Sequence, residues 1–400
     1  MRLTFVQYGG DYREAWERFE SGGKATYQAQ RYSVNFVGSL ANRSGQVSVI
    51  CGATDIAYDV VLPNKVRAIG AGLGQRLRPA DLVPIVRNTN PDLLILVTPL
   101  IPILRWARAN QVRTLATLAD SFDSGGFRNR LHYRRLAREL NHPSVEWIGN
   151  HGIGACLSLV KIGVRKDKIV PWDWPPSHRP SDYAPRRRER IEPLRLAYVG
   201  TVSEAKGVGD LIQALALLRD EELFPSLTIV GSESDASMRK LASELGVQDR
   251  VHFSGLVANE DIPAVMRAVD AVVIPSRHEY PEGLPLTIYE ALSARTPILA
   301  SDHPMFRGAL IQEESALIFP AADPQALALA IRRIGVDSNL YATLSANSEM
   351  AWNALQLPVI WGEFIEKWLS NTQADCDWLA EHCLSSGLYE AQIQLRSMKS

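Results

Sequence analysis

The chain has 400 residues, 46% of them hydrophobic and 22% charged, which is typical of a soluble globular protein too long for one ordinary core. Its four cysteines (Cys51, Cys156, Cys376 and Cys383) are scattered, which excludes a disulfide-rich or zinc-finger class and favours a reducing compartment. The first ten residues lack a signal-peptide core, and no apolar run approaches about 20 residues. We therefore expect a cytoplasmic protein, in solution or peripheral on a membrane.

The net charge of −1 conceals an asymmetry between the two halves of the chain. Residues 1–190 contain 28 Lys and Arg against 16 Asp and Glu, a net charge of +12. Residues 191–400 contain 15 against 28, a net charge of −13. The two halves are therefore expected to meet different partners.

The first half alternates predicted strands and helices. Apolar runs predict strands at 3–8, 46–51, 91–98, 113–118, 145–148 and 168–170, with helical spacing at 26–40, 79–88, 102–109, 127–140 and 153–162. Alternation of this kind predicts an α/β domain with a parallel sheet and helices on both faces.

The most basic segment is the predicted helix at 127–140. It contains Arg128, Arg130, Arg134, Arg135 and Arg138 but only one acid, Glu139. One interpretation is a solvated helix face. The other is a surface for anionic lipid head groups or for a charged acceptor glycan. A proline-rich stretch with an arginine run, 175–193, then predicts an interdomain linker.

The second half begins with a strand at 194–199, followed by a loop from Gly200 to Gly207 and a helix from 208. A strand, a glycine turn and a helix N-terminus with a lysine close by, here Lys206, predict a site for a diphosphate. The loop is not a Walker A motif, because G-x-x-x-x-G-K-[ST] is absent.

The second half also contains a segment with two glutamates. It lies between a predicted strand at 271–274 and another at 298–300, and it includes a predicted helix at 287–294. Glu282 in the loop and Glu290 in the helix are eight positions apart. The segment between them can direct backbone N–H groups at an anion, supported by the helix N-terminus. Taken alone, the two glutamates would be interpreted as a solvated loop carboxylate and a helix-surface charge.

The whole frame resembles the E-x7-E signature of retaining nucleotide-sugar glycosyltransferases with the GT-B fold, family 4 (glycosyl transferases group 1). The frame consists, in order, of a strand, Pro-Ser, Glu-Gly, Pro, Glu-Ala-Leu, and Thr-Pro-Ile before the next strand. The resemblance implies two Rossmann-like, doubly wound parallel-sheet domains that face each other across a cleft. It implies an acceptor-binding domain at 1–174, a linker at 175–193, a nucleotide-sugar-binding domain at 194–351 and a helical tail at 352–400 that crosses back to the first domain.

In this family a UDP- or GDP-sugar is the donor, and no cofactor or metal is used. The resemblance assigns the diphosphate to Lys206 and the ribose hydroxyls to Glu290, and it places Glu282 against the transferred sugar. The remaining donor-binding residues that it implies are Gly200, Thr201, Gly255, Leu256, Val257, Gly283, Leu284, Pro285 and Leu286. Thr201 stands where relatives often have an arginine, which removes one expected phosphate contact.

For the first domain the resemblance places Gly22 and Gly23 in a loop between the first strand and the first helix, at the mouth of the cleft. Asp120 matches the aspartate of a His-Asp pair, but Ala119 stands in place of the histidine. Asp120 is therefore a candidate catalytic residue with Glu282 and Lys206, and a helix-capping aspartate is the competing interpretation.

The function that these features predict is a retaining, metal-independent hexosyltransferase of polysaccharide or glycoconjugate biosynthesis. Its partners would be a nucleotide sugar and a glycan, lipid-linked or small-molecule acceptor. Peripheral contact with the inner face of the plasma membrane is expected, and nucleic acid is not. Two alternatives remain open: a GT-B nucleotide-sugar epimerase and a non-catalytic nucleotide-sugar-binding relative.

Overall fold

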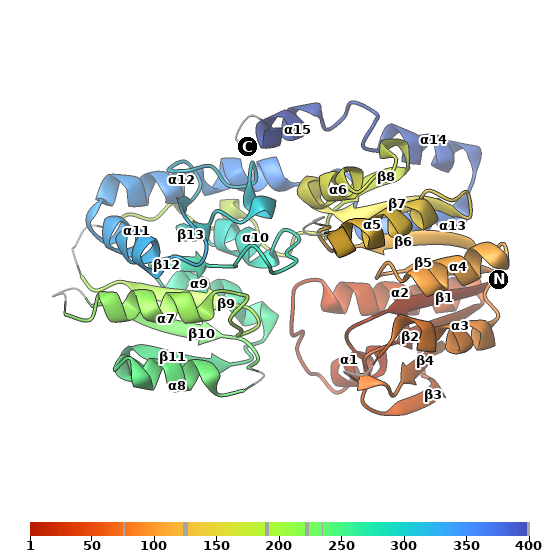
Figure 1. Cartoon of the computed structure of the whole chain (residues 1–400), viewed down its shortest axis with the longest axis horizontal. Helices are drawn as coiled ribbons and strands as arrows, with labels where there is room; N and C mark the ends of the chain where they lie inside the picture. The colour runs from red at the N-terminus through yellow and green to blue at the C-terminus, as the bar shows by residue number, and fades with distance from the viewer. Residues whose placement is uncertain (75–76, 123–126, 189–191, 221–223, 234, 398–400) are drawn as a thin grey trace. The chain divides into compact units, whose positions relative to one another are not determined.

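The computed structural model describes residues 1–400 except 75–76, 123–126, 189–191, 221–223, 234 and 398–400 (Figure 1). The chain forms two compact units. Unit 1 comprises residues 1–25, 29–175 and 357–391, and unit 2 comprises residues 26–28, 176–356 and 392–400. Each unit contains one sheet with helices on its faces.

The sheet of unit 1 has eight strands in the order β3-β4-β2-β1-β5-β6-β7-β8. Every neighbouring pair is parallel except β3 and β4, which are antiparallel. The central strands are buried along their length, as expected for a parallel sheet covered on both faces. Their bounds are β1 Arg2–Gln7, β2 Gln46–Cys51, β3 Ala57–Val61, β4 Val66–Ala71, β5 Leu93–Leu96, β6 Arg113–Leu118, β7 Val145–His151 and β8 Ile169–Trp172.

Helices from both ends of the sequence complete unit 1. One buried apolar cluster joins Leu3 and Phe5 of β1 to Phe364 and Trp368, which come from the C-terminal part of the chain. The helices of this unit are α1 Tyr12–Glu20, α2 Gln30–Ser44, η2 Pro79–Leu82, α3 Val83–Thr89, α4 Ile101–Ala109, α5 Phe127–Leu140, α6 Gly152–Lys161, η3 Lys166–Lys168, α13 Trp361–Ser370 and α14 Gln373–Glu381. The last helix, α15, is Glu390–Ser397.

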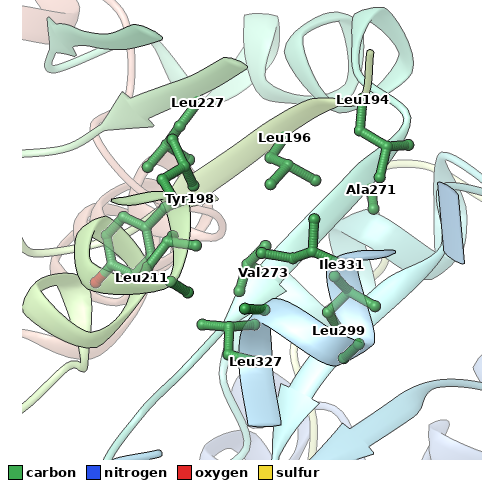
Figure 2. Packing of buried hydrophobic residues seen from close by; sticks show 14 of the residues in the cluster. Leu194, Leu196, Tyr198, Leu211, Leu227, Ala271, Val273, Leu299, Leu327 and Ile331 are labelled. Atoms are coloured by element: carbon green, nitrogen blue, oxygen red, sulfur yellow. The ribbon is translucent and has the colours of Figure 1, made fainter. Parts of the chain in front are cut away.

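The sheet of unit 2 has six parallel strands in the order β11-β10-β9-β12-β13-β14. Figure 2 shows one of its two buried faces, where alternate residues of the strands, such as Leu196 and Tyr198, pack against Leu211 of α7 and Ile331 of α11. The strands are β9 Arg195–Val199, β10 Ser226–Val230, β11 Val251–Gly255, β12 Ala271–Ile274, β13 Ile298–Ser301 and β14 Leu317–Phe319.

The opposite face of this sheet packs against α9, α10 and the end of α12, through residues that include Met266, Ile288 and Trp352. The helices of unit 2 are η4 Pro180–Asp182, α7 Val208–Leu217, α8 Ser237–Glu244, η5 Gln248–Arg250, η6 Asn259–Asp261, α9 Ile262–Ala268, α10 Leu286–Ser293, η7 Pro304–Phe306, α11 Pro324–Val336 and α12 Ser338–Leu355.

The strand order of unit 2 reverses between β9 and β12, which are neighbours in the sheet. In open α/β sheets, ligands bind at such a point, outside the carboxyl ends of the strands. The Gly200–Gly207 loop follows β9, and the loop that contains Glu282 follows β12. The fold therefore brings the two segments that the sequence singled out to the same sheet edge.

Three features of unit 1 differ from the sequence expectations. Strand β4 was not predicted, although most of its residues are buried. The segment before Gly22 forms α1, so the glycine pair follows the first helix, whereas Gly9 and Gly10 lie between β1 and α1. The expected position of Gly22 and Gly23 is therefore corrected. The sheet is also not wholly parallel, because β3 is an exposed antiparallel edge strand whose side chains lack the apolar alternation that would reveal a strand.

Candidate active site

The loop after β9 is held against the loop after β12 by close backbone contact. Gly207 has φ +73°, and a Cβ at this position would lie 2.0 Å from the carbonyl oxygen of Pro275. Only glycine fits this left-handed turn at this distance. At the other end of the loop, the Tyr198 hydroxyl donates a hydrogen bond of 2.6 Å to the carbonyl oxygen of Thr201. The loop is thus fixed at both ends.

Lys206 and Glu282 form an ion pair within unit 2. Lys206 Nζ lies 2.5 Å from Glu282 Oε1 and 4.2 Å from the centre of the Tyr280 ring. Both side chains are largely shielded, with 15% of the lysine and 7% of the glutamate side chain exposed. The pair is therefore far less screened by solvent than a surface ion pair.

Glu282 has a second donor, Ser276, whose hydroxyl donates a hydrogen bond of 2.6 Å to the same oxygen, Oε1. Ser276 is buried and lies two residues after β12. Its backbone is fixed in turn, because the Ser301 hydroxyl at the end of β13 donates a hydrogen bond of 2.6 Å to the Ser276 carbonyl oxygen. Glu282 is thus held by two neighbouring strands of the sheet.

Arg277 joins the two loops. Its guanidinium binds both carboxylate oxygens of the buried Asp210 on α7, at 2.8 and 2.7 Å, and also contacts Glu204 at 2.5 Å. Its backbone N–H donates to the carbonyl oxygen of Ala205 at 3.0 Å. The hydrogen bonds to Asp210 raise the pKa of Arg277 above its ordinary value. Because its charge is already compensated, Arg277 fixes the position of the Lys206 loop rather than offering a free cation.

Helix α10 begins at Leu286, directly after the Gly283–Pro285 turn. Thr287 in its first turn donates a hydrogen bond of 3.2 Å to the Val199 carbonyl oxygen, which fixes the helix start against the end of β9. The first N–H groups of an α-helix have no partner within the helix and carry a partial positive charge. The turn and the helix start could therefore bind an anion at the carboxyl edge of the sheet.

Glu290 lies further along α10, where Asn259 Nδ2 donates a hydrogen bond of 2.6 Å to its Oε1. The residue keeps some exposed surface. The protein nevertheless encloses the carboxyl group closely enough that burial raises its pKa to about 7, against the smaller opposing effect of Asn259. A carboxyl group in this state gains from further hydrogen-bond donors, such as a pair of hydroxyl groups.

The segment Gly255–Val257 follows β11. The Gly255 carbonyl oxygen accepts a hydrogen bond of 2.9 Å from Gly231 N–H, at the end of the neighbouring β10. Leu256 is 64% exposed, and Val257 packs against the apolar face of unit 2. Leu256 thus presents an apolar side chain to solvent at the carboxyl edge of the sheet.

Four residues that support the glutamates could not be identified from the sequence, namely Ser276, Asn259, Tyr280 and His303. His303 is buried after β13, where its Nδ1 accepts from Met305 N–H at 3.2 Å and its Nε2–H donates to the Tyr280 carbonyl oxygen at 3.1 Å. Burial lowers the pKa of His303, so the neutral form makes these contacts. The Pro-Ser pair after a strand was the only sequence signal for any of the four.

The candidate residues of unit 1 are not brought together in this way. Asp120 is half-buried two residues after β6, and burial raises its pKa. Its carboxylate accepts no hydrogen bond from the residues that the structure describes. Gly22 and Gly23 close the C-terminal end of α1, where their N–H groups donate to Phe19 and Arg18 carbonyl oxygens at 3.1 and 2.7 Å.

The basic helix α5 has a polar outer surface. Arg130, Arg134, Arg135 and Arg138 are exposed, and none of these four forms an ion pair with another described residue. The Arg128 side chain lies outside the part of the chain that the structure describes. The single acid of the helix, Glu139, is buried and faces α4, where Arg105 and Arg108 approach it at 3.1 and 2.9 Å.

Membrane-spanning helices and clustered metal ligands are both absent from the described residues. No helix in this part of the chain combines the length and apolar character that a membrane span requires. Within the same residues, no group of three or more His, Cys, Asp and Glu side chains has an arrangement suited to holding a metal ion.

Comparison with solved structures identifies the architecture. Crystal structures of Anabaena Alr3699/HepE in complex with UDP and glucose and of WaaG, a glycosyltransferase involved in lipopolysaccharide biosynthesis, both have TM-scores of 0.66 to this chain. They cover 93% and 92% of this chain and 100% of their own chains, at 17% and 19% identity. At such identity the likeness concerns the fold alone. Together with the two sheets, it confirms the expected α/β architecture of the GT-B fold.

Comparison of sequences finds matches to part of the chain. Residues 184–350 match the family described as Glycosyl transferases group 1. D-inositol 3-phosphate glycosyltransferase of Salinispora tropica is 32% identical over 164 residues, which are 38% of this chain and 33% of that protein. Alpha-D-kanosaminyltransferase of Streptomyces kanamyceticus is 29% identical over 248 residues, 57% of this chain and 62% of that protein. The chain thus spans about a third to two thirds of these relatives.

Proposed function

We propose that this protein is a glycosyltransferase that moves a hexose from a UDP- or GDP-sugar to an acceptor hydroxyl. The observation that carries the proposal is the shielded Lys206–Glu282 pair at the point where the strand order of unit 2 reverses, next to the start of α10. The family match of residues 184–350 and the glycosyltransferases among the relatives support it.

The chemistry follows from where charge develops. The bond between the anomeric carbon and the diphosphate oxygen breaks, and the electron pair leaves with the nucleoside diphosphate. The charge on that oxygen would be stabilised by Lys206, by the Thr201 hydroxyl and by the amides between Gly283 and Leu286. Because a cationic side chain and fixed backbone dipoles would do this, we propose that the reaction needs no metal ion.

The acceptor oxygen would form the new bond to the anomeric carbon, and its proton would pass to the departing phosphate oxygen. The E-x7-E resemblance supports attack from the face on which the diphosphate leaves, with retention of configuration. We assign Glu282 to the sugar, where it would orient the ring and stabilise its positive charge. We assign Glu290 to the ribose hydroxyls. Burial raises the pKa of Glu290 and Asn259 donates one hydrogen bond to it, so its carboxylate would be stabilised by further donors such as these hydroxyls. Gly255, Leu256 and Val257 would lie beside the base.

Unit 1 would bind the acceptor. Asp120 is the candidate contact there. The exposed arginines of α5 would hold an anionic glycan or the anionic inner face of the plasma membrane. A lipid-linked or glycan acceptor of polysaccharide or glycoconjugate biosynthesis fits both the charge and the proposed cytoplasmic location.

A donor panel tests the proposal. Wild-type protein would be heated with UDP-glucose, UDP-galactose, UDP-N-acetylglucosamine, GDP-mannose or GDP-fucose in the presence of EDTA, and the Tm recorded. At least one nucleotide sugar should raise the Tm, and that donor should then be consumed with release of its nucleoside diphosphate when lipid or glycan acceptors are added. Epimer exchange without an acceptor would instead identify an epimerase, and binding without turnover under any acceptor would identify a binding protein.

A further inference from the structure

The two hydrogen-bond donors of Glu282 meet the same carboxylate oxygen. Ser276 Oγ lies 2.6 Å and Lys206 Nζ 2.5 Å from Oε1. The other oxygen, Oε2, accepts no hydrogen bond from the described residues. The Glu282 side chain keeps 7% of its surface exposed. The carboxylate therefore has one oxygen held by two donors and one oxygen without a donor among the described residues.

A bound diphosphate would affect the two donors of Glu282, Lys206 and Ser276, differently. Lys206 is a cation on a flexible stem, and under the proposed function it must also reach the diphosphate. A doubly charged diphosphate competes with Glu282 for that ammonium group. The Ser276 hydroxyl is neutral, buried and on a short side chain, and its backbone is fixed by Ser301. A diphosphate does not draw this hydroxyl away from Glu282, because the hydroxyl carries no charge and its residue is buried.

We propose that Ser276 is the positioning residue of the reaction. It holds Glu282 Oε1 while Lys206 engages the departing diphosphate, and it thereby keeps Oε2 directed at the sugar. This inference rests on the proposed function and deepens it. It assigns the fixed orientation of the carboxylate to the serine of the Pro-Ser pair, and not to the lysine that forms the ion pair.

A structural role for Ser276 makes a different prediction. If the hydroxyl only satisfied a buried carboxylate, its loss would lower stability and would affect binding and turnover together. If it positions Glu282 during the reaction, its loss should lower kcat and leave the affinity for a nucleoside diphosphate unchanged, because that ligand has no sugar for Glu282 to contact.

The test compares Ser276→Ala, Ser276→Cys and Ser348→Ala with wild-type protein. Ser348 is a matched control, because it is equally buried and its hydroxyl donates a 3.0 Å hydrogen bond to the Leu344 carbonyl oxygen within α12 and to neither glutamate. Cysteine keeps the size of serine but is a weak donor, so it separates loss of the hydrogen bond from loss of packing. Ser276→Thr keeps the hydroxyl and serves as the rescue variant.

For the donor selected by the panel, we expect kcat to fall about tenfold or more in Ser276→Ala and Ser276→Cys, the scale of a hydrogen bond to a charged group. The Kd for UDP or GDP should stay within about twofold, and Ser276→Thr should recover most of the kcat. Equal kcat in wild type and Ser276→Cys, or parallel loss of kcat and UDP or GDP affinity, would overturn the inference while leaving the proposed function intact. Wild-type protein that neither binds nor consumes any donor would overturn both.

Discussion

The candidate residues of unit 2 contact one another, whereas those of unit 1 stand apart on their sheet edge and helix surface. Lys206, Glu282 and Ser276 are joined within 2.6 Å, and Arg277 is held by Asp210 and Glu204. In unit 1 the exposed arginines of α5 form no ion pair with a described residue, and the Asp120 carboxylate accepts no hydrogen bond from one. Both sets are charged, yet only one is organised before a ligand arrives.

This difference indicates two kinds of recognition. Partly buried charges in fixed positions act over short distances and lose little to salt or to reorganisation. Exposed arginines on a helix act over longer distances, tolerate variation in their partner and are screened by salt. We therefore expect unit 2 to select one small ligand and unit 1 to be attracted to an anionic surface. The predictions that follow each test one side of this contrast.

The largest effect is expected at Glu282. Glu282→Ala removes the group assigned to the sugar and should lower kcat by about a hundredfold or more, the scale seen when a preorganised polar group at a reacting centre is lost. The Kd for the matching nucleoside diphosphate should change little. Steady-state kinetics and calorimetry on the same preparation measure both. A variant with kcat within twofold of wild type would show that Glu282 does not contact the sugar.

Reversal of three arginines on α5 should have a comparable effect on a different property. With about 1 kcal/mol for each arginine near an anionic bilayer, Arg130→Glu, Arg134→Glu and Arg135→Glu together should weaken binding to phosphatidylglycerol vesicles by about a hundredfold. Donor binding should be unchanged, and salt should weaken the binding of wild-type protein.

A charge-matched control variant distinguishes an effect of the α5 arginines on vesicle binding from an effect of net charge alone. Arg219, Lys240 and Arg333 are exposed in unit 2, and their reversal changes the net charge equally. Vesicle binding should persist in that variant. If both triple variants lose binding equally, the attraction depends on overall charge and α5 is an ordinary solvated helix.

A smaller effect is expected at Glu290. Glu290→Gln should weaken nucleoside diphosphate binding about tenfold at pH 8, because ribose hydroxyls donate more strongly to a carboxylate than to an amide. In wild-type protein the raised pKa, about 7, means that the carboxylate forms as pH rises from 6 to 8, so affinity should rise over that range. The ligand phosphate also titrates near pH 6. The Glu290 contribution is therefore the part of the pH dependence that Glu290→Gln abolishes, and identical profiles would remove Glu290 from the ribose site.

The smallest effect concerns the stability of the loop that carries Glu282. Burial lowers the pKa of His303; the charge of Glu282 opposes this shift, and those of His278 and Lys206 add to it. Below about pH 6.5 the unfolded chain therefore binds a proton that the folded protein does not, and stability should fall as pH falls. His303→Gln should make urea unfolding less dependent on pH between 7 and 5. An unchanged dependence would show that His303 makes no such contribution.

The sequence was sufficient to predict the parts of the site that depend on element order. The order of strand, glycine loop and helix predicted that Lys206 lies at the carboxyl edge of the sheet. The pattern around Glu282 and Glu290 identified the neighbouring loop. It could not predict that Ser276 and Lys206 share Oε1, because that contact depends on side-chain directions in an irregular loop. Nor could it reveal His303, which contacts Tyr280 from the segment after β13, 23 residues along the chain.

Local patterns failed where the chain departs from regular amphipathic spacing. The helix α1 was missed because its charged residues and the following glycines resemble a polar loop. The edge strand β3 was missed because its side chains are mostly exposed. Strand β4 was missed as well. None of these errors affected the site in unit 2, where buried strands and turns alternate clearly.

The central claim is that unit 2 binds a nucleoside diphosphate through Lys206. Isothermal calorimetry of wild-type protein with UDP and GDP in EDTA tests it directly, with Lys206→Ala and the control Lys240→Ala, a lysine that is 78% exposed. We predict binding of one of the two ligands, weakened by about 1.5–3 kcal/mol in Lys206→Ala and unchanged in Lys240→Ala. Equal affinity in wild type and Lys206→Ala, or no binding of either ligand to wild-type protein, would contradict the account.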